Sequence, residues 1–344
     1  MPFLRTALFI FRWFMSNIKF SFIVLAVLGI GGCQTVTPPK FTVGSTGLSE
    51  PPATDAQVRA DRINFKKLKQ QEHRPIVALV LGSGGARGYA HIGVIQVLEQ
   101  YGIHPDLIVG TSAGSIVGSI YASGKTAEEL RTIALSMKAN DVRDVKLDMK
   151  GFFDGQKVEN YVNQQVNNTP LESLKTPMYV VATELKEGKK VVFNYGNTGQ
   201  AVRASVSIPS MFIPTRIGKE EYVDGGLVSP VPVEVARDLG ADIVIAVDIL
   251  AQPMHTETRN VWGMFNQNIN IMQSRLAEEE LKHADIIIQP DLREKGHIFD
   301  VKGREMTMQA GVEAAQNQLN TITTLLKQKH YPFGYTIQQL SVQD

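Results

Sequence analysis

The stretch PDLIVGTSAGS, residues 105–115, decides the fold that the sequence predicts. Its apolar first part predicts a short buried strand over residues 106–109, and Gly110-Thr111-Ser112-Ala113-Gly114 follows directly. An amphipathic helix comes next, because apolar side chains then recur at helical spacing. A serine between two glycines at a strand-to-helix turn is the pattern of a nucleophile elbow, which exposes the serine Oγ at a helix N-terminus. The same letters also occur at ordinary helix starts, so the elbow is a hypothesis about Ser112.

A glycine-rich loop follows the apolar strand that we predict at residues 76–81. The loop reads Gly82-Ser83-Gly84-Gly85-Ala86-Arg87-Gly88. Glycines let a ligand approach the backbone and leave N–H groups turned toward an anion, as in a dinucleotide site or an oxyanion hole. The glycines miss the dinucleotide spacing by one position, and Asp106 precedes its strand instead of following one. The loop therefore favours an oxyanion hole, and the charge of Arg87 would be useful near an oxyanion or a lipid phosphate.

An acidic residue and two glycines end a further predicted strand, in Tyr222-Val223-Asp224-Gly225-Gly226. Apolar strands and amphipathic helices alternate from about residue 76 to 290, which predicts one α/β domain with a mainly parallel sheet. Gly84, Ser112 and Asp224 all fall at predicted strand ends, where the functional groups of such sheets gather. We therefore expect these three residues to meet.

The remaining pattern is less specific. The other predicted strands are 178–183, 191–195, 243–248 and 286–289, and the other predicted helices are 201–208, 230–239, 262–283 and 304–329. Residues 125–175 are charged and predict helices, with a loop at residues 151–155. In that loop the adjacent Phe152 and Phe153 either face lipid or pack in a local core.

The composition excludes some classes of function. The chain has 344 residues, 43% of them hydrophobic, and a formal net charge of +1. It has no basic stripe of the kind that binds nucleic acid, so we expect no nucleic-acid partner. No His, Asp or Glu cluster has metal-ligand spacing, so we expect no metal and no cofactor.

The positions of the histidines leave a Ser–Asp–His catalytic triad possible. His255, His283, His297 and His330 follow the predicted acid, as a Ser–Asp–His triad in hydrolase order requires. His283 ends a predicted helix and His297 lies in a charged loop, and we interpret both as surface residues. His91 falls in the first turn after the glycine-rich loop, where we favour a structural hydrogen bond.

Three blocks together resemble the patatin-like phospholipase family, nearest its bacterial members related to neuropathy target esterase. They are the loop from Ser83 to Gly88, the elbow from Gly110 to Gly114, and Asp224-Gly225-Gly226. The segment from Ala204-Ser205 through Pro209 and on to Pro214 also resembles this family. Ser83 stands where the family has its first glycine, which matters little because the donors of such a loop are backbone N–H groups. The resemblance covers about residues 76–248 and implies a three-layer α/β/α fold with a mainly parallel central sheet.

The resemblance also implies the chemistry of the site. Ser112 would attack an ester carbonyl, and Asp224 would accept its proton, directly or through a water. N–H groups around Gly84, Gly85 and Ala113 would stabilise the oxyanion. Arg87 would help to hold the loop or the lipid phosphate. The implied site also includes Gly88, Gly110, Gly114, Gly225 and Gly226. The implied activity is hydrolysis of phospholipids, lysophospholipids or simpler esters. The alternative is a lipidated envelope protein that binds lipid or a partner without turnover.

The N-terminal region predicts export and a lipid anchor. Residues 1–32 carry three basic residues and no acidic ones, and they contain an apolar run at 20–32 that is short for a membrane span and suits a signal peptide. Ile30-Gly31-Gly32-Cys33 resembles the lipobox of bacterial lipoproteins, which makes Cys33, the only cysteine, the expected lipidation site. By resemblance to bacterial lipoprotein sorting, Gln34 then favours the outer membrane. The alternative is an uncleaved anchor with an incidental cysteine.

These features divide the chain into four expected parts. They are a signal peptide at 1–32, a polar tether at 33–74, a catalytic domain at 75–290 and a C-terminal helical extension at 291–344. The oligomeric state is left open.

Overall fold

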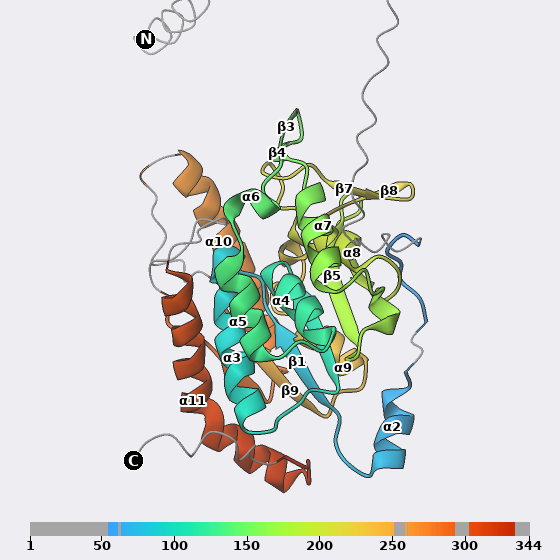
Figure 1. The fold of residues 1–344 in the computed structure, drawn as a ribbon, viewed down its shortest axis with the longest axis vertical. Helices are drawn as coiled ribbons and strands as arrows, with labels where there is room; N and C mark the ends of the chain where they lie inside the picture. Colours follow the sequence, from blue (N-terminus) through green and yellow to red (C-terminus); the bar gives the residue numbers. More distant parts are fainter. Residues whose placement is uncertain (1–53, 61–62, 251–258, 260, 293–302, 334–344) are drawn as a thin grey trace, which may run out of the picture. The chain divides into compact units, whose positions relative to one another are not determined.

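The structure is a computed structural model, and it describes residues 54–60, 63–250, 259, 261–292 and 303–333 (Figure 1). The chain divides into two units, and all of these residues belong to the unit Gly47–Asp344. The expected signal peptide, Cys33, His255 and His297 lie outside the described residues.

Apolar runs form the central strands of an eight-stranded sheet. β1 (Val77–Leu81), β2 (Leu107–Thr111) and β9 (Ile243–Val247) are buried along their whole length, as expected for parallel strands that are covered on both faces. β5 (Met178–Glu184) and β10 (Ile286–Ile288) extend this parallel part. The order of strands is β10-β9-β1-β2-β5-β8-β7, and β6 also pairs with β5.

Helices cover both faces of the sheet and confirm the three-layer α/β/α prediction (Figure 1). Because side chains alternate along a strand, Val77, Leu79 and Leu81 face one layer, whereas Ala78 and Val80 face the other. The first layer contains α3 (Tyr89–Gln100), α4 (Ala113–Ala122), α5 (Ala127–Ser136), α7 (Gln156–Gln165), α8 (Thr198–Val206) and α11 (Arg304–Gln328). The second layer contains α2 (Phe65–Glu72), α9 (Val233–Asp238) and α10 (Val261–Leu281).

Antiparallel strands complete the sheet beyond its parallel part. They are β6 (Lys190–Phe193), β7 (Thr215–Ile217) and β8 (Glu220–Asp224). β6 pairs with residues 180–183 of β5 and so occupies one edge of that strand. β2 pairs with residues 178–181 and β8 with residues 182–184, so these two strands share the other edge, one after the other.

The shared edge of β5 brings the ends of β2 and β8 together. Thr111 ends β2 and pairs with Val181, while Asp224 ends β8 and pairs with Ala182. Because β8 runs antiparallel to β5, its end meets the end of β2 instead of lying beside it. Asp224 therefore lies at a strand end, as we expected, although its strand is not one of the parallel strands.

Residues 125–175 contain a hairpin that the charged, helical pattern did not predict. α5, α6 (Ala139–Val142), α7 and the 3₁₀ turn η2 (Leu171–Ser173) agree with that pattern. β3 (Val145–Asp148) and β4 (Gly151–Phe153) pair antiparallel within it. Phe153 packs against Phe212 with 5.6 Å between ring centroids, whereas Phe152 is exposed. Only one of the two phenylalanines thus belongs to a local core.

Both segments that flank the expected catalytic domain pack onto it. In the expected tether, Ala56 and Phe65 are buried in the domain core. In the expected extension, α11 lies along α3 so closely that a Cβ on Gly93 would sit 1.9 Å from the carbonyl oxygen of Met308. The compact domain therefore extends from at least residue 54 to α11, beyond the boundaries expected from the sequence.

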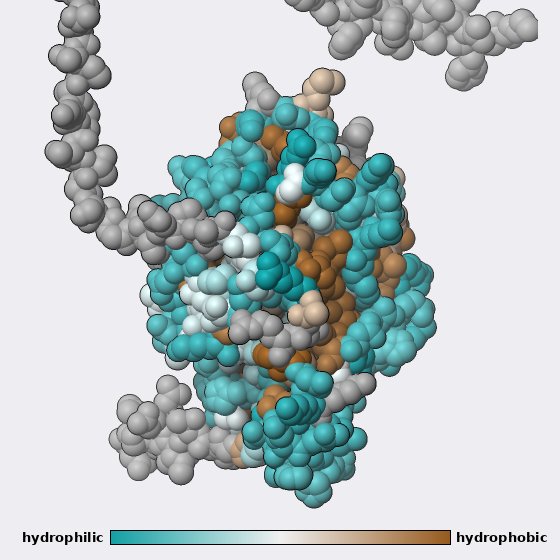
Figure 2. Space-filling model, turned by 90° about the vertical axis from the view of Figure 1, so that its right-hand side faces the viewer, coloured by the Kyte–Doolittle hydropathy of each residue, from teal (hydrophilic) through white to brown (hydrophobic). Residues whose placement is uncertain are grey.

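The surface of the domain has apolar regions. Figure 2 shows a band of apolar surface between hydrophilic flanks. On α10, the side chains of Met264, Ile271 and Met272 are also exposed. Among the described helices, none is both long enough and apolar enough to cross a membrane.

Candidate active site

Ser112 joins β2 to α4 in a backbone conformation that costs energy for a residue with a side chain. Its φ is 53° and its ψ is −117°, and such conformations cost about 1–3 kcal/mol. The flanking glycines permit the close contacts of this turn. A Cβ on Gly110 would lie 2.6 Å from the carbonyl oxygen of Gly114, and one on Gly114 would lie 2.0 Å from that of Leu81. The Gly-x-Ser-x-Gly pattern therefore forms the expected strand–turn–helix.

Asp224 faces Ser112 across the shared edge of β5. Ser112 Oγ donates a hydrogen bond to Asp224 Oδ2 at 2.7 Å, and the Gly226 N–H donates to Oδ1 at 2.7 Å. Thr183 Oγ1 donates to the Asp224 carbonyl oxygen at 2.8 Å and ties the acid to β5. A Cβ on Gly225 would lie 2.3 Å from a carbonyl oxygen of β5, so the residue after the acid has to be small.

The environment makes the Asp224 carboxylate a stronger base than a solvated one. Ser112 and Asp224 are each 3% exposed. Burial raises the pKa of Asp224 to about 6, against the hydrogen bonds from Ser112 and Gly226, which lower it. The group is still ionised at neutral pH, where a base with this pKa accepts a proton more readily than an ordinary carboxylate does.

The burial of Ser112 contradicts the exposed Oγ that the elbow pattern predicts. The 3₁₀ turn η1 (Gly85–Gly88) and α8 pack closely around the serine. A Cβ on Gly88 would lie 2.9 Å from the Ala113 Cβ, and Ser205 Oγ lies 2.8 Å from Ser112 N.

The glycine-rich loop presents backbone donors beside the elbow. The first two N–H groups of the loop, those of Gly82 and Ser83, donate to backbone carbonyl oxygens. The next two, those of Gly84 and Gly85, and the N–H of Ala113 donate to no acceptor within the described part of the chain. Gly85 has a φ of 58°, in the left-handed region that favours glycine. Unpaired N–H groups of this kind are what an oxyanion requires.

Arg87 ties the loop to the segment after β9. Its Nε donates to the Ile249 carbonyl oxygen at 2.8 Å. Burial lowers the pKa of Arg87 to about 10, and the nearby Asp248 carboxylate opposes that shift, so the guanidinium stays charged. Gln289 Nε2 donates to Asp248 Oδ2 at 2.8 Å and holds this carboxylate in place. Of the two roles expected for Arg87, this contact fits the holding of the loop.

None of the described histidines contacts the serine–aspartate pair. His91 is fully buried, and its Nε2 lies 2.9 Å from the Gly82 carbonyl oxygen, at the start of the loop. Burial lowers the pKa of His91 to about 4, so the ring is neutral and Nε2–H donates. His283 and His330 are exposed near the ends of α10 and α11. The described residues thus contain a pair and no Ser–Asp–His triad.

The structure places hydroxyl groups at the site for which the sequence analysis predicts no role. The hydroxyls of Ser205 on α8 and Thr183 in β5 bond to the serine–aspartate pair, and the backbone carbonyl oxygen of Ser207 accepts from the Asp224 N–H. In the sequence, Ser205 and Ser207 lie in a segment that ends a short predicted helix and resembles the family, but nothing local in it indicates which groups they bond to. Ser205 is 93 positions from Ser112, so the fold alone brings them together.

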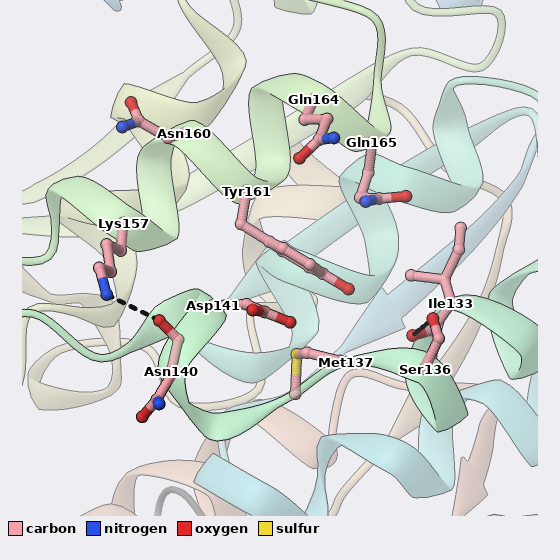
Figure 3. A pocket seen from close by; sticks show the side chains of 10 residues that line it. All are labelled: Ile133, Ser136, Met137, Asn140, Asp141, Lys157, Asn160, Tyr161, Gln164 and Gln165. Atoms are coloured by element: carbon pink, nitrogen blue, oxygen red, sulfur yellow. Dashed lines mark hydrogen bonds between the residues drawn. The ribbon is translucent and has the colours of Figure 1, made fainter.

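A polar pocket of about 470 Å³ lies apart from these residues, between α5, α6 and α7 (Figure 3). Tyr161 points into it, and burial raises the pKa of this phenol to about 12. None of the lining residues belongs to the three motifs. Across the described ranges, no group of three His, Cys, Asp or Glu side chains is placed to hold a metal ion.

Comparison with known proteins supports the resemblance that the motifs carry. Residues 79–237 match the family described as patatin-like phospholipase. An uncharacterised NTE family protein of Mycobacterium tuberculosis is 38% identical over 178 residues, which are 51% of this chain and 49% of that protein. Patatin-like phospholipase domain-containing protein 6 of Homo sapiens is 34% identical over 203 residues, 56% of this chain and 15% of that protein. The match thus spans about half the length of the mycobacterial relative and a small part of the human one.

Solved structures resemble the domain at low identity. VipD from Legionella pneumophila aligns with a TM-score of 0.42 and 14% identity, over 72% of this chain and 67% of that one. The type III effector ExoU aligns with a TM-score of 0.42 and 11% identity, over 72% and 53%. The fold assignment rests on the sheet order and the two helical layers of the chain itself.

Asp224→Asn should stabilise the fold at alkaline pH. The folded pKa of about 6 exceeds the ordinary 3.8, so ionisation of Asp224 costs folding free energy as pH rises from about 4 to about 6. The full cost is at most about 3 kcal/mol, and the neutral amide avoids it. Urea unfolding of both proteins at pH 4.5 and pH 8 should show a larger advantage of the variant at pH 8. An equal difference at the two pH values would contradict a raised pKa.

Proposed function

We propose that this chain, with a patatin-like phospholipase domain at residues 79–237, is a serine lipid acyl hydrolase with a Ser112–Asp224 dyad. The observation that carries the proposal is the 2.7 Å hydrogen bond from Ser112 Oγ to the buried carboxylate of Asp224. The proposed substrates are carboxylic esters of lipids, phospholipids and lysophospholipids among them. Relatives named as patatin-like phospholipase proteins support this class.

In the proposed acylation, Ser112 Oγ forms a bond to the ester carbonyl carbon while its proton passes to Asp224 Oδ2. The carbonyl oxygen becomes an oxyanion that accepts hydrogen bonds from the unpaired N–H groups of Gly84, Gly85 and Ala113. The oxyanion then collapses, the bond from carbon to the alkoxy oxygen breaks, and Asp224 returns the proton to the leaving alcohol. The product is an acyl-serine with the deacylated lipid released.

In the proposed deacylation, the same groups act on water. Asp224 takes a proton from a water whose oxygen bonds to the acyl carbon, and the N–H groups again stabilise the oxyanion. The bond to Ser112 Oγ breaks, Oγ recovers the proton, and a fatty acid leaves. A carboxylate is a weak base for a hydroxyl. The raised pKa of Asp224 makes it a stronger base, and the preorganised donors lower the barrier further by stabilising the oxyanion. Removal of one such donor typically costs about 10²–10³ in rate.

Ser112→Ala and Asp224→Asn should each lower kcat on a short-chain ester by at least about 10³-fold. The double variant should be no slower than either one, because residues that act as a unit are not additive. Initial rates of the purified, folded proteins provide the measurement. The matched controls are His283→Ala and His330→Ala, which alter exposed side chains and should retain most of the activity.

The pH profile adds a second readout to the same experiment. Because Asp224 must be ionised to accept a proton, kcat/KM should fall about tenfold per pH unit below the pKa of about 6 and level off above it. The dyad is refuted if a histidine variant loses as much activity as Ser112→Ala while Asp224→Asn stays active. If the wild-type protein binds lipid but hydrolyses no ester, the alternative function is favoured, in which a lipidated envelope protein binds lipid without turnover.

We further propose that the protein is a lipoprotein of the bacterial envelope, in the outer membrane. The support is the sequence Ile30-Gly31-Gly32-Cys33-Gln34 after a basic and apolar segment. Acyl chains on Cys33 would anchor the domain, since each buried CH₂ contributes about 0.8 kcal/mol. An anchored domain would meet its lipid substrates at a surface and not in solution.

Cys33→Ser should accumulate an unprocessed precursor that takes up no labelled fatty acid. Gln34→Asp is the matched variant, because aspartate after the lipidated cysteine favours retention in the inner membrane by resemblance to bacterial sorting. It should keep the label and change its membrane fraction. Fractionation on a sucrose gradient and gel migration measure both effects. If Cys33→Ser migrates and fractionates like the wild type, the lipoprotein proposal is wrong.

A further inference from the structure

The backbone N–H of Ser112 has an unusual partner. Ser112 precedes the first turn of α4 in a left-handed conformation, with a φ of 53°. Its N–H donates to the side-chain oxygen of Ser205 on α8 at 2.8 Å. The strained residue is therefore held by a hydroxyl group from another helix.

The hydroxyl of Ser205 has one orientation available. Ser205 is fully buried, and its Oγ donates to the Val181 carbonyl oxygen of β5 at 2.6 Å. Since a hydroxyl has one proton, the oxygen then accepts the Ser112 N–H through a lone pair. Val181 is also the residue with which Thr111, just before the serine, pairs in the sheet. Ser205 thus bridges the elbow to β5, the strand that pairs with β2.

The end of α8, which carries Ser205, also holds Asp224, the other member of the serine–aspartate pair. The Asp224 N–H donates to the Ser207 carbonyl oxygen at 3.0 Å, two residues after Ser205. Ser207 Oγ donates to the Arg203 carbonyl oxygen at 2.7 Å, which fixes this turn on the end of α8. The side chain of Arg203 pairs with Asp154 at 2.5 Å and anchors the outer side of the helix. Ser112 and Asp224 are therefore both held by one short segment of the chain.

We propose that Ser205 is a positioning residue for the reaction: its Oγ holds the Ser112 backbone so that the Ser112 Oγ is aimed at Asp224. The expected loss of kcat rests on the proposed hydrolase function, whereas the expected change in the position of the Ser112 Oγ does not. Without the Ser205 acceptor, the Ser112 N–H is buried and unpaired, and the elbow relaxes from its strained φ. The Ser112 Oγ then loses its alignment with the carboxylate.

The test is Ser205→Ala, compared with the wild type. Because substrate contacts remain, KM should stay within about twofold, while kcat falls about 10²-fold, as misplacement by about 1 Å can cause. Loss of the hydrogen bond from Ser112 should also raise the pKa of Asp224, since that bond lowers it. The carboxyl titration of Asp224, followed by ¹³C NMR, should move to higher pH, and so should the acid limb of kcat/KM.

Ser119→Ala is the matched control. Ser119 is a buried serine of α4 whose Oγ has no partner among the described residues, so the same truncation should leave kcat and the titration unchanged. If Ser205→Ala does not fold, Ser205→Cys replaces it, because a thiol has a similar shape and is a weaker acceptor. This variant should also lower kcat and move the Asp224 titration to higher pH.

The proposal is overturned if a folded Ser205 variant keeps the kcat and the Asp224 titration of the wild type. It is also overturned if Ser119→Ala moves both readouts as far as Ser205→Ala does. A wild type without esterase activity would refute the hydrolase function alone. The NMR titration needs no turnover, so it would still decide whether Ser205 positions Ser112.

Discussion

The meeting of β2 and β8 on one edge of β5 is the constraint on which the site depends. Three consecutive residues of β5 carry it: Val181 pairs with Thr111, Ala182 pairs with Asp224, and Thr183 donates to the Asp224 carbonyl oxygen. A shift of β8 by one residue would turn the Asp224 side chain to the opposite face of the sheet. The register of one short antiparallel strand therefore determines whether the serine and the carboxylate meet.

This constraint explains why small residues surround the pair. Gly225 passes within contact distance of β5, and Gly114 passes close to the end of β1, so neither position has room for a Cβ. The close approach in turn buries Asp224 and raises the pKa of its carboxyl. The strained backbone of Ser112 and the buried charge of Asp224 both lower the stability of the fold, and destabilising features of this kind are characteristic of functional sites. The hydroxyls of Thr183 and Ser205 partly offset them by satisfying buried backbone groups.

Local patterns of the sequence predict the parts of this site but not their assembly. The apolar runs at β1, β2 and β9 and the glycines around Ser112 are local signals, and the structure forms the expected strands and turn there. Asp224 was expected at a strand end, but the direction of β8 depends on pairing with β5, which is distant in the sequence. The burial of Ser112, the contact of Ser205 and the packing of α11 on α3 depend on tertiary contacts that no local pattern encodes. The hairpin of β3 and β4 lies in a charged segment, where weak alternation gives no strand signal.

The proposed function requires that Ser112 is a nucleophile activated by Asp224. Covalent trapping of the intact protein with a fluorophosphonate, followed by digestion and mass spectrometry of the peptides, tests this requirement. One phosphonate adduct is expected, on Ser112, and its rate of formation should fall by at least about 10²-fold in Asp224→Asn. An adduct on another residue, or equal rates of trapping in the wild type and in Asp224→Asn, would contradict it.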